Sequence, residues 1–543
     1  MASKLSKPKP FTSSVILFFF ACLFFTINYI RQLQSEFQKA TSTESVEKLG
    51  WFDVVVPFIR DEKINIGLVN IDGVHVDNID LKLKRRANMV KVHFDPVADY
   101  IKWKDLFPVW INEKYPSKCP EIQMPRFDHY QELDVILARV PCGRDDEGRD
   151  VLRLQVNLVV ANLLLRSRRK NNNSSVFAVF TGSCTPMWEI FRCDDLFWHE
   201  GNYWVYKPEL KRLQQKVLMP VGTCQPAPAI LEQGQEMWRK YDNTSQSHTL
   251  PQPREAYVTV LHSSENYVCG AIALAQSIIK TKTTKDLVLL ADVDRISQYF
   301  LKGLREAGWK IKPIRRIRSS HSKRHAYNEY NYSKLRIWQL KNYDKVMFID
   351  SDFIVLKNID KFFNYPQLSA VSNDKHIFNS GLMLIEPSIC TFKTLMKKRF
   401  SVASYNGGDQ GFLNEIFPWW HRLPGKLNHL KYFDDINDQM HEIPDDLYAM
   451  HYLGLKPWMC YQDYDCNWDS LEYQIFASDM AHERWWNVYK GMPKKLKQYC
   501  SLTSEMAARI QKHRAKAKNA NFVDGHWKIK VKDPRRLSIL SIS

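Results

Sequence analysis

The chain has 543 residues, more than one average domain, and its 45% hydrophobic and 25% charged residues are typical of a globular protein and exclude a disordered one. The formal net charge of +18 is compatible with nucleic-acid binding, but no RRM, zinc-finger or basic-helix pattern accompanies it, so we expect no nucleic-acid partner. The aromatic share of 13% fits either a large core or stacking on sugar rings.

The first predicted element is an uncharged apolar run over residues 11–30. Twenty helical residues span about 30 Å, the thickness of a membrane's hydrocarbon core. Three lysines precede the run and one arginine follows it closely, so the positive-inside rule places residues 1–10 in the cytoplasm and the remainder in a lumen. A cleaved signal peptide would need a shorter apolar core and a small-residue cleavage site. We therefore predict a single-pass type II signal anchor, followed by a stem over residues 31–50.

Cysteines and glycosylation sequons fit a luminal chain. Ten of the 11 Cys lie beyond the apolar run, where an oxidising compartment permits disulfides. Short separations make Cys184 with Cys193, and Cys460 with Cys466, candidate pairs, although sequence alone cannot fix the pairing. The absence of any CxxC spacing argues against a zinc site. The sequons are Asn172, Asn173, Asn243 and Asn331.

Residues 51–240 read as an additional α/β luminal region without a recognisable chemical motif. The apolar runs 51–59, 64–71 and 176–180 predict strands, and residues 154–170 predict a helix with basic residues at its C-terminal end. Residues 241–255 are polar and contain two prolines, which predicts a linker.

A regular alternation of strands and helices follows the linker. The predicted strands are 256–263, 285–292, 309–314 and 344–349. The predicted helices between them are 270–281, 296–308 and 333–341. This alternation indicates parallel β-α-β units covered on both faces, whose ligands bind beyond the carboxyl ends of the strands.

Two pairs of aspartates follow apolar strands in this part of the chain. Asp350 and Asp352 flank Ser351 directly after the strand 344–349. Residues i and i+2 of an extended backbone point to the same side, so these carboxylates could hold a hard divalent cation that bridges phosphate oxygens. Asp292 and Asp294 have the same spacing after another strand. The spacing alone does not choose between the two pairs.

The surrounding motifs favour Asp350 and Asp352. HSSENYVCGA and YSKLRIWQL precede this pair, while HIFNSGLMLIEPS, NGGDQGFLN and HYLGLKPW follow it. In this order, over about residues 257–458, the motifs resemble those of the glycogenin-like glycosyltransferases, glycosyltransferase family 8. The flanking regions are similar to the plant glycogenin-like glucuronosyltransferases that act on xylan in the Golgi.

The resemblance implies an α/β fold of the GT-A type, a Rossmann-like nucleotide-sugar-binding catalytic domain over residues 256–500, followed by a basic C-terminal tail over 501–543. It implies a Golgi membrane protein whose one helix anchors it, and a retaining transfer of glucuronic acid from UDP-glucuronate onto xylan during cell-wall biogenesis. UDP donors of glucose, galactose or xylose are alternatives, and so is a non-catalytic Golgi scaffold that binds glycans. The oligomeric state stays open.

The same resemblance implies a Mn²⁺ site and a donor site. Asp350, Asp352 and His451 would hold Mn²⁺, which accepts imidazole and carboxylate ligands together. Ser351, between the two aspartates, would join them in contacting the donor. Without its motif, His451 would read as a core histidine. The uridine would meet Leu261, Ser264 (or Ser263) and Tyr267. The phosphates would meet the segment His451, Tyr452, Leu453, Gly454, Leu455 and Lys456. The sugar would lie between two groups of residues, namely Asn379, Ser380 and Gly381, and the loop Asn406, Gly407, Gly408, Asp409 and Gln410.

Lys334 and Asp409 are the candidate catalytic residues. Lys334 of YSKL would help to neutralise the departing UDP, although a surface lysine is the simpler alternative. Asp409 is the first carboxylate to test as a covalent nucleophile, while front-face attack by the acceptor hydroxyl is the favoured route. NGGDQ taken alone would also fit a plain turn. The basic run 315–324 stands in the sequence where it could read a donor's carboxylate.

Overall fold

The computed structural model describes residues 50–59, 63–71, 86–108, 110–112, 115–142, 149–167, 176–228, 253–373, 377–433 and 441–535. The predicted cytoplasmic tail, anchor and stem, nearly all of the predicted linker, and three sequons (Asn172, Asn173 and Asn243) lie outside these residues. Among the helices of the described ranges, none combines the length and apolar character needed to cross a membrane.

The chain divides by its internal contacts into the units Met1–Arg60 and Asp61–Ser543. The described part of the first unit is helical, with α2 (Trp51–Val55) followed by η1 (Val56–Phe58). The prediction of a strand over 51–59 is therefore wrong. Asp53 in the first turn accepts a bond from the Gly50 amide, and Pro57 stands at the start of η1, where its fixed φ suits a helix. These local signals outweigh the β-propensity of three consecutive valines.

The second unit contains a six-stranded sheet in the order β2-β1-β3-β4-β6-β5. Its first four strands are parallel, and the last two form an antiparallel hairpin. The strands are β1 (Ile64–Val69), β2 (Ala87–Lys91), β3 (Val135–Arg139), β4 (Phe177–Thr181), β5 (Leu196–Glu200) and β6 (Tyr203–Tyr206). The helices of this region are α5 (Trp103–Leu106), α6 (Val151–Arg166) and α7 (Leu210–Val217). The strands expected at 64–71 and 176–180 and the helix expected at 154–170 are confirmed.

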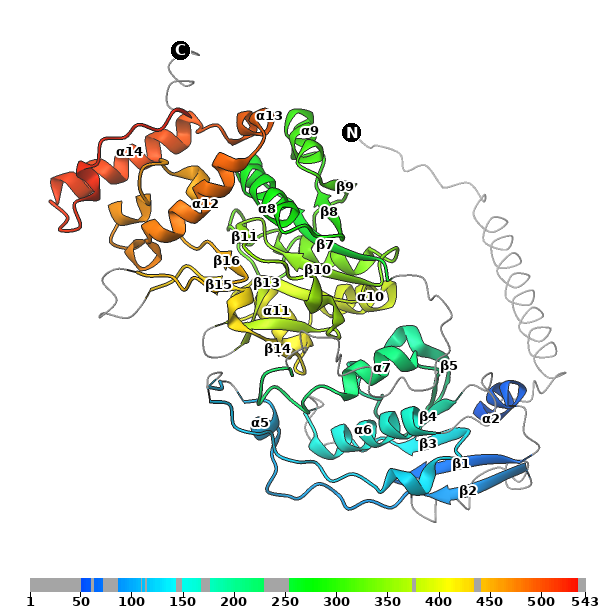
Figure 1. Ribbon diagram of the computed structural model, residues 1–543. Coiled ribbons are helices and arrows are strands. Elements are labelled where there is room, and N and C mark those ends of the chain that lie inside the picture. Colours follow the sequence, from blue (N-terminus) through cyan, green and yellow to red (C-terminus); the bar gives the residue numbers. More distant parts are fainter. Residues whose placement is uncertain are drawn as a thin grey trace, which may run out of the picture. The chain divides into compact units, whose positions relative to one another are not determined.

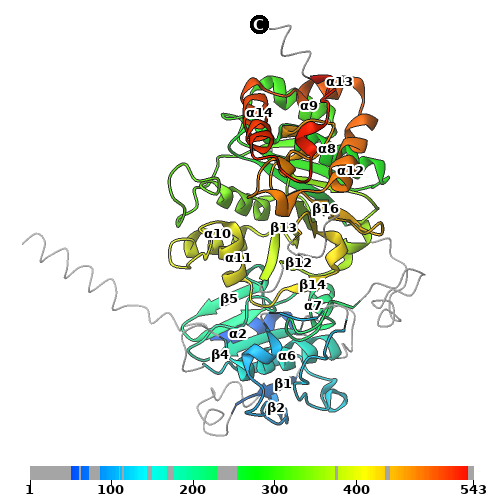
Figure 2. The same cartoon turned by 90° about the vertical axis from the view of Figure 1, so that its left-hand side faces the viewer.

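A seven-stranded mixed sheet follows, in the order β14-β12-β13-β10-β7-β8-β9 (Figure 1). Strands β10, β7, β8 and β9 are parallel, as the alternation predicts, while β13 runs antiparallel to β10. The strands are β7 (Glu255–Leu261), β8 (Asp286–Ala291), β9 (Lys310–Pro313), β10 (Lys345–Ile349), β12 (Ser369–Asn373), β13 (Ile377–Ile385) and β14 (His421–Leu423). Figure 2 shows β12, β13 and β14 as neighbours.

Helices cover both faces of this sheet. Alternate strand residues such as Tyr257 and Met347 join one core with α8 (Val268–Lys280) and α9 (Gln298–Glu306). Their neighbours Val258 and Phe348 join a second core with η6 (Asn331–Gln339), α10 (Ile389–Lys398) and α11 (Asp409–Ile416). The alternation follows from the two-residue repeat of a strand, and burial on both faces explains why the strands are continuously apolar.

A three-stranded sheet and a helical C-terminal region complete the unit. The sheet contains β11 (Phe353–Val355), β16 (Ala449–His451) and β15 (His429–Leu430). The helices are α12 (Asp479–Gly491), α13 (Lys494–Lys497) and α14 (Ser504–Asn519). In the stretch expected to be a basic tail, α14 buries Ile510 and Ala517, and the buried Arg535 donates to the carbonyl oxygens of Trp458 (2.9 Å) and Cys460 (2.5 Å).

The cysteines of the described ranges form five disulfides, Cys119–Cys224, Cys142–Cys184, Cys193–Cys390, Cys269–Cys500 and Cys460–Cys466. The pair Cys460–Cys466 is confirmed, whereas the pair Cys184–Cys193 is wrong. Cys142 and Cys184 follow the neighbouring parallel strands β3 and β4, which brings them together. Cys193 opens the short helix η3 (Cys193–Asp195), which packs beside α10 and Cys390.

Candidate active site

Asp350 and Asp352 lie where β10 ends and β11 begins. The Asp350 amide donates to the Gly381 carbonyl (2.8 Å) on β13, and the Asp352 carbonyl accepts from the Tyr452 amide (2.9 Å). Because β11 pairs antiparallel with β16, Phe353 lies opposite His451. One ligand atom from each of Asp350, Asp352 and His451 lies within 4.8 Å of the others. Two sheets thus bring together residues about one hundred positions apart.

The orientation of His451 is fixed by its neighbours. Its ring stacks on Phe353 with centroids 4.2 Å apart, and its Nδ1 lies 3.2 Å from the Asn428 amide oxygen. Its Nε2 therefore faces the carboxylates, 3.4 Å from Asp352 Oδ1. A second partner that holds the other ring nitrogen is the usual arrangement for a metal-binding histidine.

Gly381 keeps the space between these groups open. A Cβ at this position would lie 2.7 Å from Asn379 Oδ1, 2.9 Å from His451 Cε1 and 3.2 Å from Asp350 Oδ2. The first two separations are closer than a methyl group tolerates. Two carboxylates and one imidazole around such a space fit a divalent cation, and the mixed oxygen and nitrogen set suits Mn²⁺ better than Mg²⁺.

The two aspartates differ in their electrostatic surroundings. Burial raises the pKa of Asp350 to about 6, with the attraction of Lys334 acting against it. Burial would also raise the pKa of Asp352, but attraction to Lys456 and His451 outweighs it and holds that pKa below its usual value. Lys456 Nζ lies 2.7 Å from Asp352 Oδ2. Asp352 is thus stabilised as an anion by the HYLGLK segment itself.

Lys334 connects the aspartate pair to the NGGDQ loop. Its Nζ lies 2.6 Å from Asp409 Oδ2 and 3.4 Å from Asp350 Oδ1, and it donates to the Ser380 carbonyl (3.0 Å). Burial would lower the pKa of Lys334, but Asp350 and Asp409 outweigh it and raise this pKa. Lys334 is buried, so the alternative of a surface lysine is wrong.

The NGGDQ loop is tied to β13. The Ser380 hydroxyl donates to Asp409 Oδ2 (2.7 Å), and the Ser380 amide donates to Gln410 Oε1 (3.3 Å). Asn406 Oδ1 accepts from the Gly408 amide (2.9 Å) and closes the loop. Gly407 has φ of 67°, which favours glycine. The loop is more than a plain turn, because its side chains connect two elements that line one cavity.

These residues surround a cavity of about 320 Å³. Eleven of the predicted site residues line it, namely Lys334, Asp350, Asn379, Ser380, Gly381, Asn406, Gly408, Asp409, Gln410, His451 and Leu453. The remaining predicted residues do not belong to the described lining, namely Leu261, Ser264, Tyr267, Ser351, Asp352, Gly407, Tyr452, Gly454, Leu455 and Lys456. Asp352 and Lys456 adjoin it through their contacts with His451 and with each other.

The residues expected around a uridine have contacts of their own. Tyr267 is half-buried and packs edge-on against Trp458, with centroids 5.9 Å apart. Ser264 accepts a bond from the Asn266 amide (3.1 Å) at the start of η5 (Glu265–Tyr267). Leu261 belongs to the core. Their contact with a nucleotide stays a prediction.

The segment 451–456, which we expect to meet the phosphates, is held in place by its neighbours. Gly454 has φ of 71°, and the Leu455 amide donates to the Asn467 side chain (2.8 Å). Tyr452 is fully buried and donates its hydroxyl to the Ala481 carbonyl (2.9 Å).

Several lining residues were missed by the sequence analysis. They are Val260, His262, Tyr327, Asn328, Asn331 and Asn373. Asn328 donates to the Asn406 carbonyl (2.7 Å) and supports the NGGDQ loop. Burial lowers the pKa of His262 to about 4, so its imidazole is neutral. His262 directly follows β7, and the rule that sites form at the carboxyl ends of strands could have identified it.

The competing pair Asp292 and Asp294 has no such surroundings. Asp292 Oδ2 lies 3.7 Å from Arg316 Nε, and Asp294 is exposed. Arg316 also stacks on Tyr330, and Arg318 pairs with Glu329 (3.3 Å). Within the described lining of the cavity, neither this aspartate pair nor the basic run 315–324 is present.

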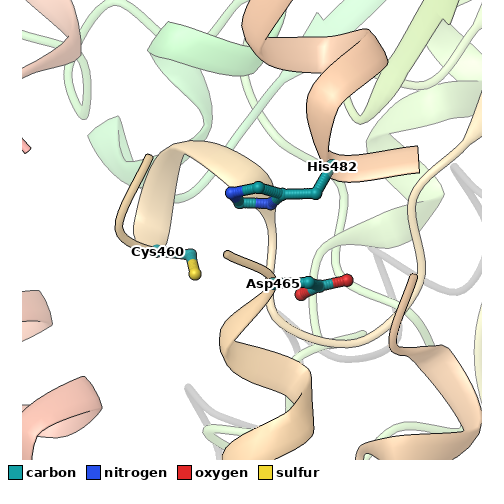
Figure 3. A group of neighbouring side chains, drawn as sticks. All are labelled: Cys460, Asp465 and His482. Carbon is teal, nitrogen blue, oxygen red and sulfur yellow. The ribbon is translucent and has the colours of Figure 1, made fainter. Parts of the chain in front are cut away.

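A second group of potential metal ligands has a structural role. Figure 3 shows Cys460, Asp465 and His482 together. Cys460 is bonded to Cys466, and Asp465 Oδ2 lies 2.7 Å from Lys431 Nζ in a fully buried ion pair. His482 Nε2 lies 2.8 Å from the Tyr461 carbonyl. Because the Cys460 sulfur is in a disulfide and the Asp465 carboxylate is in an ion pair, this cluster stabilises the fold and is a poor candidate for a metal site.

Comparison with known proteins is consistent with this geometry. Residues 258–461 match glycosyl transferase family 8, and residues 38–224 match the GUX1-5 N-terminal domain. The chain is 51% identical over 499 residues to the putative UDP-glucuronate:xylan alpha-glucuronosyltransferase 4 of Arabidopsis thaliana, which covers 90% of this chain and 89% of that protein. It is 49% identical to UDP-glucuronate:xylan alpha-glucuronosyltransferase 2 of the same plant, covering 87% and 81% of the two chains. Human glycogenin-1 is 28% identical over 43% of this chain and 71% of its own.

Proposed function

The chain belongs to glycosyl transferase family 8 and is a glycosyltransferase, and from this premise we propose that it transfers glucuronic acid from UDP-glucuronate onto xylan. The names of the two Arabidopsis relatives, which match this chain over about nine tenths of its length, support this donor and this acceptor. The N-terminal anchor and a Golgi location belong to the same proposal.

The observation that carries the proposal is the convergence of three motifs on one cavity. Asp350, His451 and the NGGDQ loop line the same cavity. Lys334 pairs both with Asp350 and with Asp409 of that loop. A scaffold that only binds glycans would not need two buried lysines, Lys334 and Lys456, each paired with a carboxylate of the cation site. Enzyme chemistry on a nucleotide sugar does require such charges.

Asp350, Asp352 and His451 would hold Mn²⁺ in this proposal. When bound, the ion supplies positive charge that neutralises the phosphates of the departing UDP. Lys456, which pairs with Asp352, and Lys334, which pairs with Asp350, would add positive charge beside the same phosphates. Preorganised charges of this kind contribute the largest share of catalysis in many enzymes.

The polar loops would orient the sugar in a catalytic domain of the GT-A type. Asn379 is fixed by a bond from its amide nitrogen to Asn373 (2.8 Å), and Gln410 by bonds to Ser380 and Tyr405. Side chains held in this way keep their geometry when a sugar binds, which lowers the entropy lost on binding.

We propose retention of the anomeric configuration through front-face attack by the acceptor hydroxyl. Asp409 Oδ2 already accepts bonds from Lys334 and Ser380, and attraction to Lys334 outweighs burial and lowers the pKa of Asp409. An anion stabilised in this way is a poorer nucleophile than a free carboxylate, which argues against a covalent intermediate on Asp409. The acceptor proton would pass to a phosphate oxygen of the departing UDP.

The proposal is tested by transfer assays on the full chain in detergent. Xylo-oligosaccharides are incubated with Mn²⁺ and, in turn, UDP-glucuronate, UDP-glucose, UDP-galactose and UDP-xylose, and products are measured by mass. Transfer from UDP-glucuronate is expected, and it should be abolished by EDTA and restored by Mn²⁺. Transfer of another sugar instead would overturn the donor assignment, and unchanged transfer in EDTA would overturn the metal.

Asp352→Asn and Asp294→Asn form a matched pair for this assay. Both replace the second aspartate of a D-x-D, but only Asp352 belongs to the candidate cation site. Loss of a metal ligand should lower activity by at least about 100-fold, since even the loss of a residue that only hydrogen-bonds to a ligand costs about 10–100-fold. Asp294 is exposed, so the Asp294→Asn variant should keep full activity. Similar losses in the two variants would contradict the site.

A further inference from the structure

The parallel part of the six-stranded sheet has a topology that creates a binding crevice. From β1 the chain passes to β2 on one side, and then to β3 on the other side of β1. The strand order 2-1-3-4 is that of the flavodoxin-like doubly wound sheets. In such sheets ligands bind beyond the carboxyl ends of the strands, at the point where the order reverses.

A cleft of about 780 Å³ lies beyond the carboxyl ends of β1 and β2, at this edge of the sheet. It is lined by Asn70 and Ile71 directly after β1, by the segment 91–96 at the end of β2, and by Leu152 in α6, the helix that follows β3. Residues 123–126, which precede the short helix η2 (Phe127–Tyr130), form another side. The cleft is thus larger than the candidate active site, and it lies at the carboxyl edge of the parallel strands, where ligands of such sheets bind.

The side chains of the cleft give it a positive charge. Lys91, His93, Arg126 and His129 line it and are all exposed, whereas Asp95 is the acidic residue of the described lining. No ion pair involves the four basic side chains within the described ranges. The base of the cleft includes the buried Tyr130, whose hydroxyl accepts from the His93 amide (3.0 Å), and the half-buried Phe94. Exposed cations beside aromatic rings suit an anionic ligand with an apolar face.

We propose that this cleft binds an acidic oligosaccharide, namely a xylan segment that already carries glucuronate. This inference rests on the proposed function, because the product of that reaction is a polysaccharide with carboxylates. The half-buried Phe94 ring can stack on a sugar face while the exposed Lys91 and Arg126 meet carboxylates along the chain. The cleft would hold a decorated part of the same polysaccharide and raise the local concentration of acceptor sites at the active site.

An acidic oligosaccharide fits the cleft better than a nucleotide does. The lysines that would meet phosphates at the active site, Lys334 and Lys456, are buried and paired. Here the basic side chains are exposed and come from two separate segments, 91–93 and 126–129, with the cations Lys91 and Arg126 in different segments. That arrangement matches an extended polyanion with spaced charges more closely than a compact diphosphate.

Binding to the full chain in detergent tests the proposal, with Lys91→Ala/Arg126→Ala as the variant. Lys302→Ala/Arg305→Ala is the matched control, because it removes one lysine and one arginine that are also exposed, on α9. Affinity is measured by calorimetry, in EDTA and without UDP-sugar, for glucuronate-bearing xylo-oligosaccharides, neutral xylo-oligosaccharides, oligogalacturonate and UDP. The cleft variant should lose at least about 10-fold in affinity for the glucuronate-bearing ligand, and the control should lose none. The wild-type affinity should fall with added salt.

The other outcomes separate this proposal from the function on which it rests. Equal affinity in both variants, or UDP as the ligand that the cleft variant loses, overturns the acidic-glycan site. Equal binding of oligogalacturonate supports recognition of carboxylates rather than of the xylan backbone. The cleft variant should still transfer glucuronate to short neutral acceptors at a rate within about 2-fold of wild type. Absent transfer in the wild-type chain, with cleft binding intact, would contradict the proposed function alone. If the double variant unfolds, Arg126→Gln provides the same comparison.

Discussion

At the scale of single residues, Gly381 determines how closely the candidate metal ligands approach one another. It lies on β13, where its carbonyl accepts from the Asp350 amide and its Cα faces His451 and Asn379. Its backbone φ is negative, so alanine would be compatible with the backbone but not with the space. The requirement for glycine here is therefore steric.

Gly381→Ala should lower Mn²⁺-dependent transfer by about 10-fold or more, because the added methyl displaces His451 or Asp350 from the ligand geometry. The effect should appear as a higher Mn²⁺ concentration for half-maximal activity, with the melting temperature little changed. Gly491→Ala is the control, since a Cβ there would meet no atom within 4 Å. Wild-type Mn²⁺ dependence in Gly381→Ala would show that the cation is not held at this place.

The site residues could be predicted to different degrees. The position of Asp350 and Asp352 directly after an apolar strand predicted a possible site, but only the surrounding motifs distinguished them from Asp292 and Asp294. The support from Asn328 could not be predicted, because it belongs to a loop without periodicity and reaches Asn406 across 78 positions. Contacts of this kind depend on how the sheet is folded.

At the scale of elements, the buried ion pair of Lys431 with Asp465 stabilises the position of β16. The Lys431 amide donates to the His451 carbonyl (2.9 Å), and its ammonium pairs with Asp465, both side chains being almost fully buried. Asp465 also accepts from the amides of Ser478 (2.9 Å) and Asn467 (3.1 Å). Burial would raise the pKa of Asp465, but Lys431 outweighs it, and the pKa lies below its usual value.

Lys431→Met should reduce the free energy of unfolding by about 3–5 kcal/mol at pH 7, because it leaves the Asp465 carboxylate buried without its partner. The pKa of Asp465 is lowered in the folded wild type, so its stabilisation is complete above about pH 4 and is lost as the pH falls further. The difference between variant and wild type should therefore shrink in acid. Urea unfolding at several pH values measures it.

Lys426→Met provides the control for this prediction. Lys426 pairs with Asp446, but both side chains are more than half exposed. A surface pair of this kind contributes little, so we expect no measurable change. Equal effects in the two variants, or a difference that grows in acid, would contradict the role assigned to Lys431.

The strand and helix pattern of 256–349 could be predicted because short, continuously apolar strands alternate with longer helical segments, of which α8 is mostly buried and α9 is amphipathic. The segment 51–59 could not, since three valines suggest a strand while a capping aspartate and a proline favour a helix. The pairing of Cys184 failed for a related reason. Cys184 is closer in sequence to Cys193, but the pairing of β3 with β4 places it beside Cys142.

At the scale of the whole molecule, long-range disulfides join distant parts of the chain. Cys193–Cys390 spans 197 positions and lies beside the ion pair of Arg192 with Glu386 (2.6 Å). It connects η3, which lies between β4 and β5 of the six-stranded sheet, to α10. Cys460–Cys466, in contrast, closes a loop of six positions.

Cys193→Ser/Cys390→Ser should destabilise the protein by about 2–4 kcal/mol, more than Cys460→Ser/Cys466→Ser, since a longer loop loses more entropy when it is closed. Thermal unfolding of both variants under oxidising conditions measures the difference. A larger loss in the short-loop variant would contradict the entropic account for this protein.

The role of the N-terminal region could not be predicted from the sequence. The lining of its cleft comes from separate segments between residues 68 and 152, and these residues have no fixed spacing. A site formed by the order of the strands and by basic side chains far apart in the sequence has no contiguous sequence motif. The active site differs, because each of its parts is a short contiguous segment.

The buried Arg535 has a consequence for inherited variation. Its guanidinium ties the segment around Asp533 to the carbonyls of Trp458 and Cys460, directly after the segment that ends in Lys456, and pairs with Asp533 (2.6 Å). An allele with a stop codon shortly before Arg535 would keep every segment of the candidate active site but lose that tie, and we expect such alleles to behave as loss-of-function alleles.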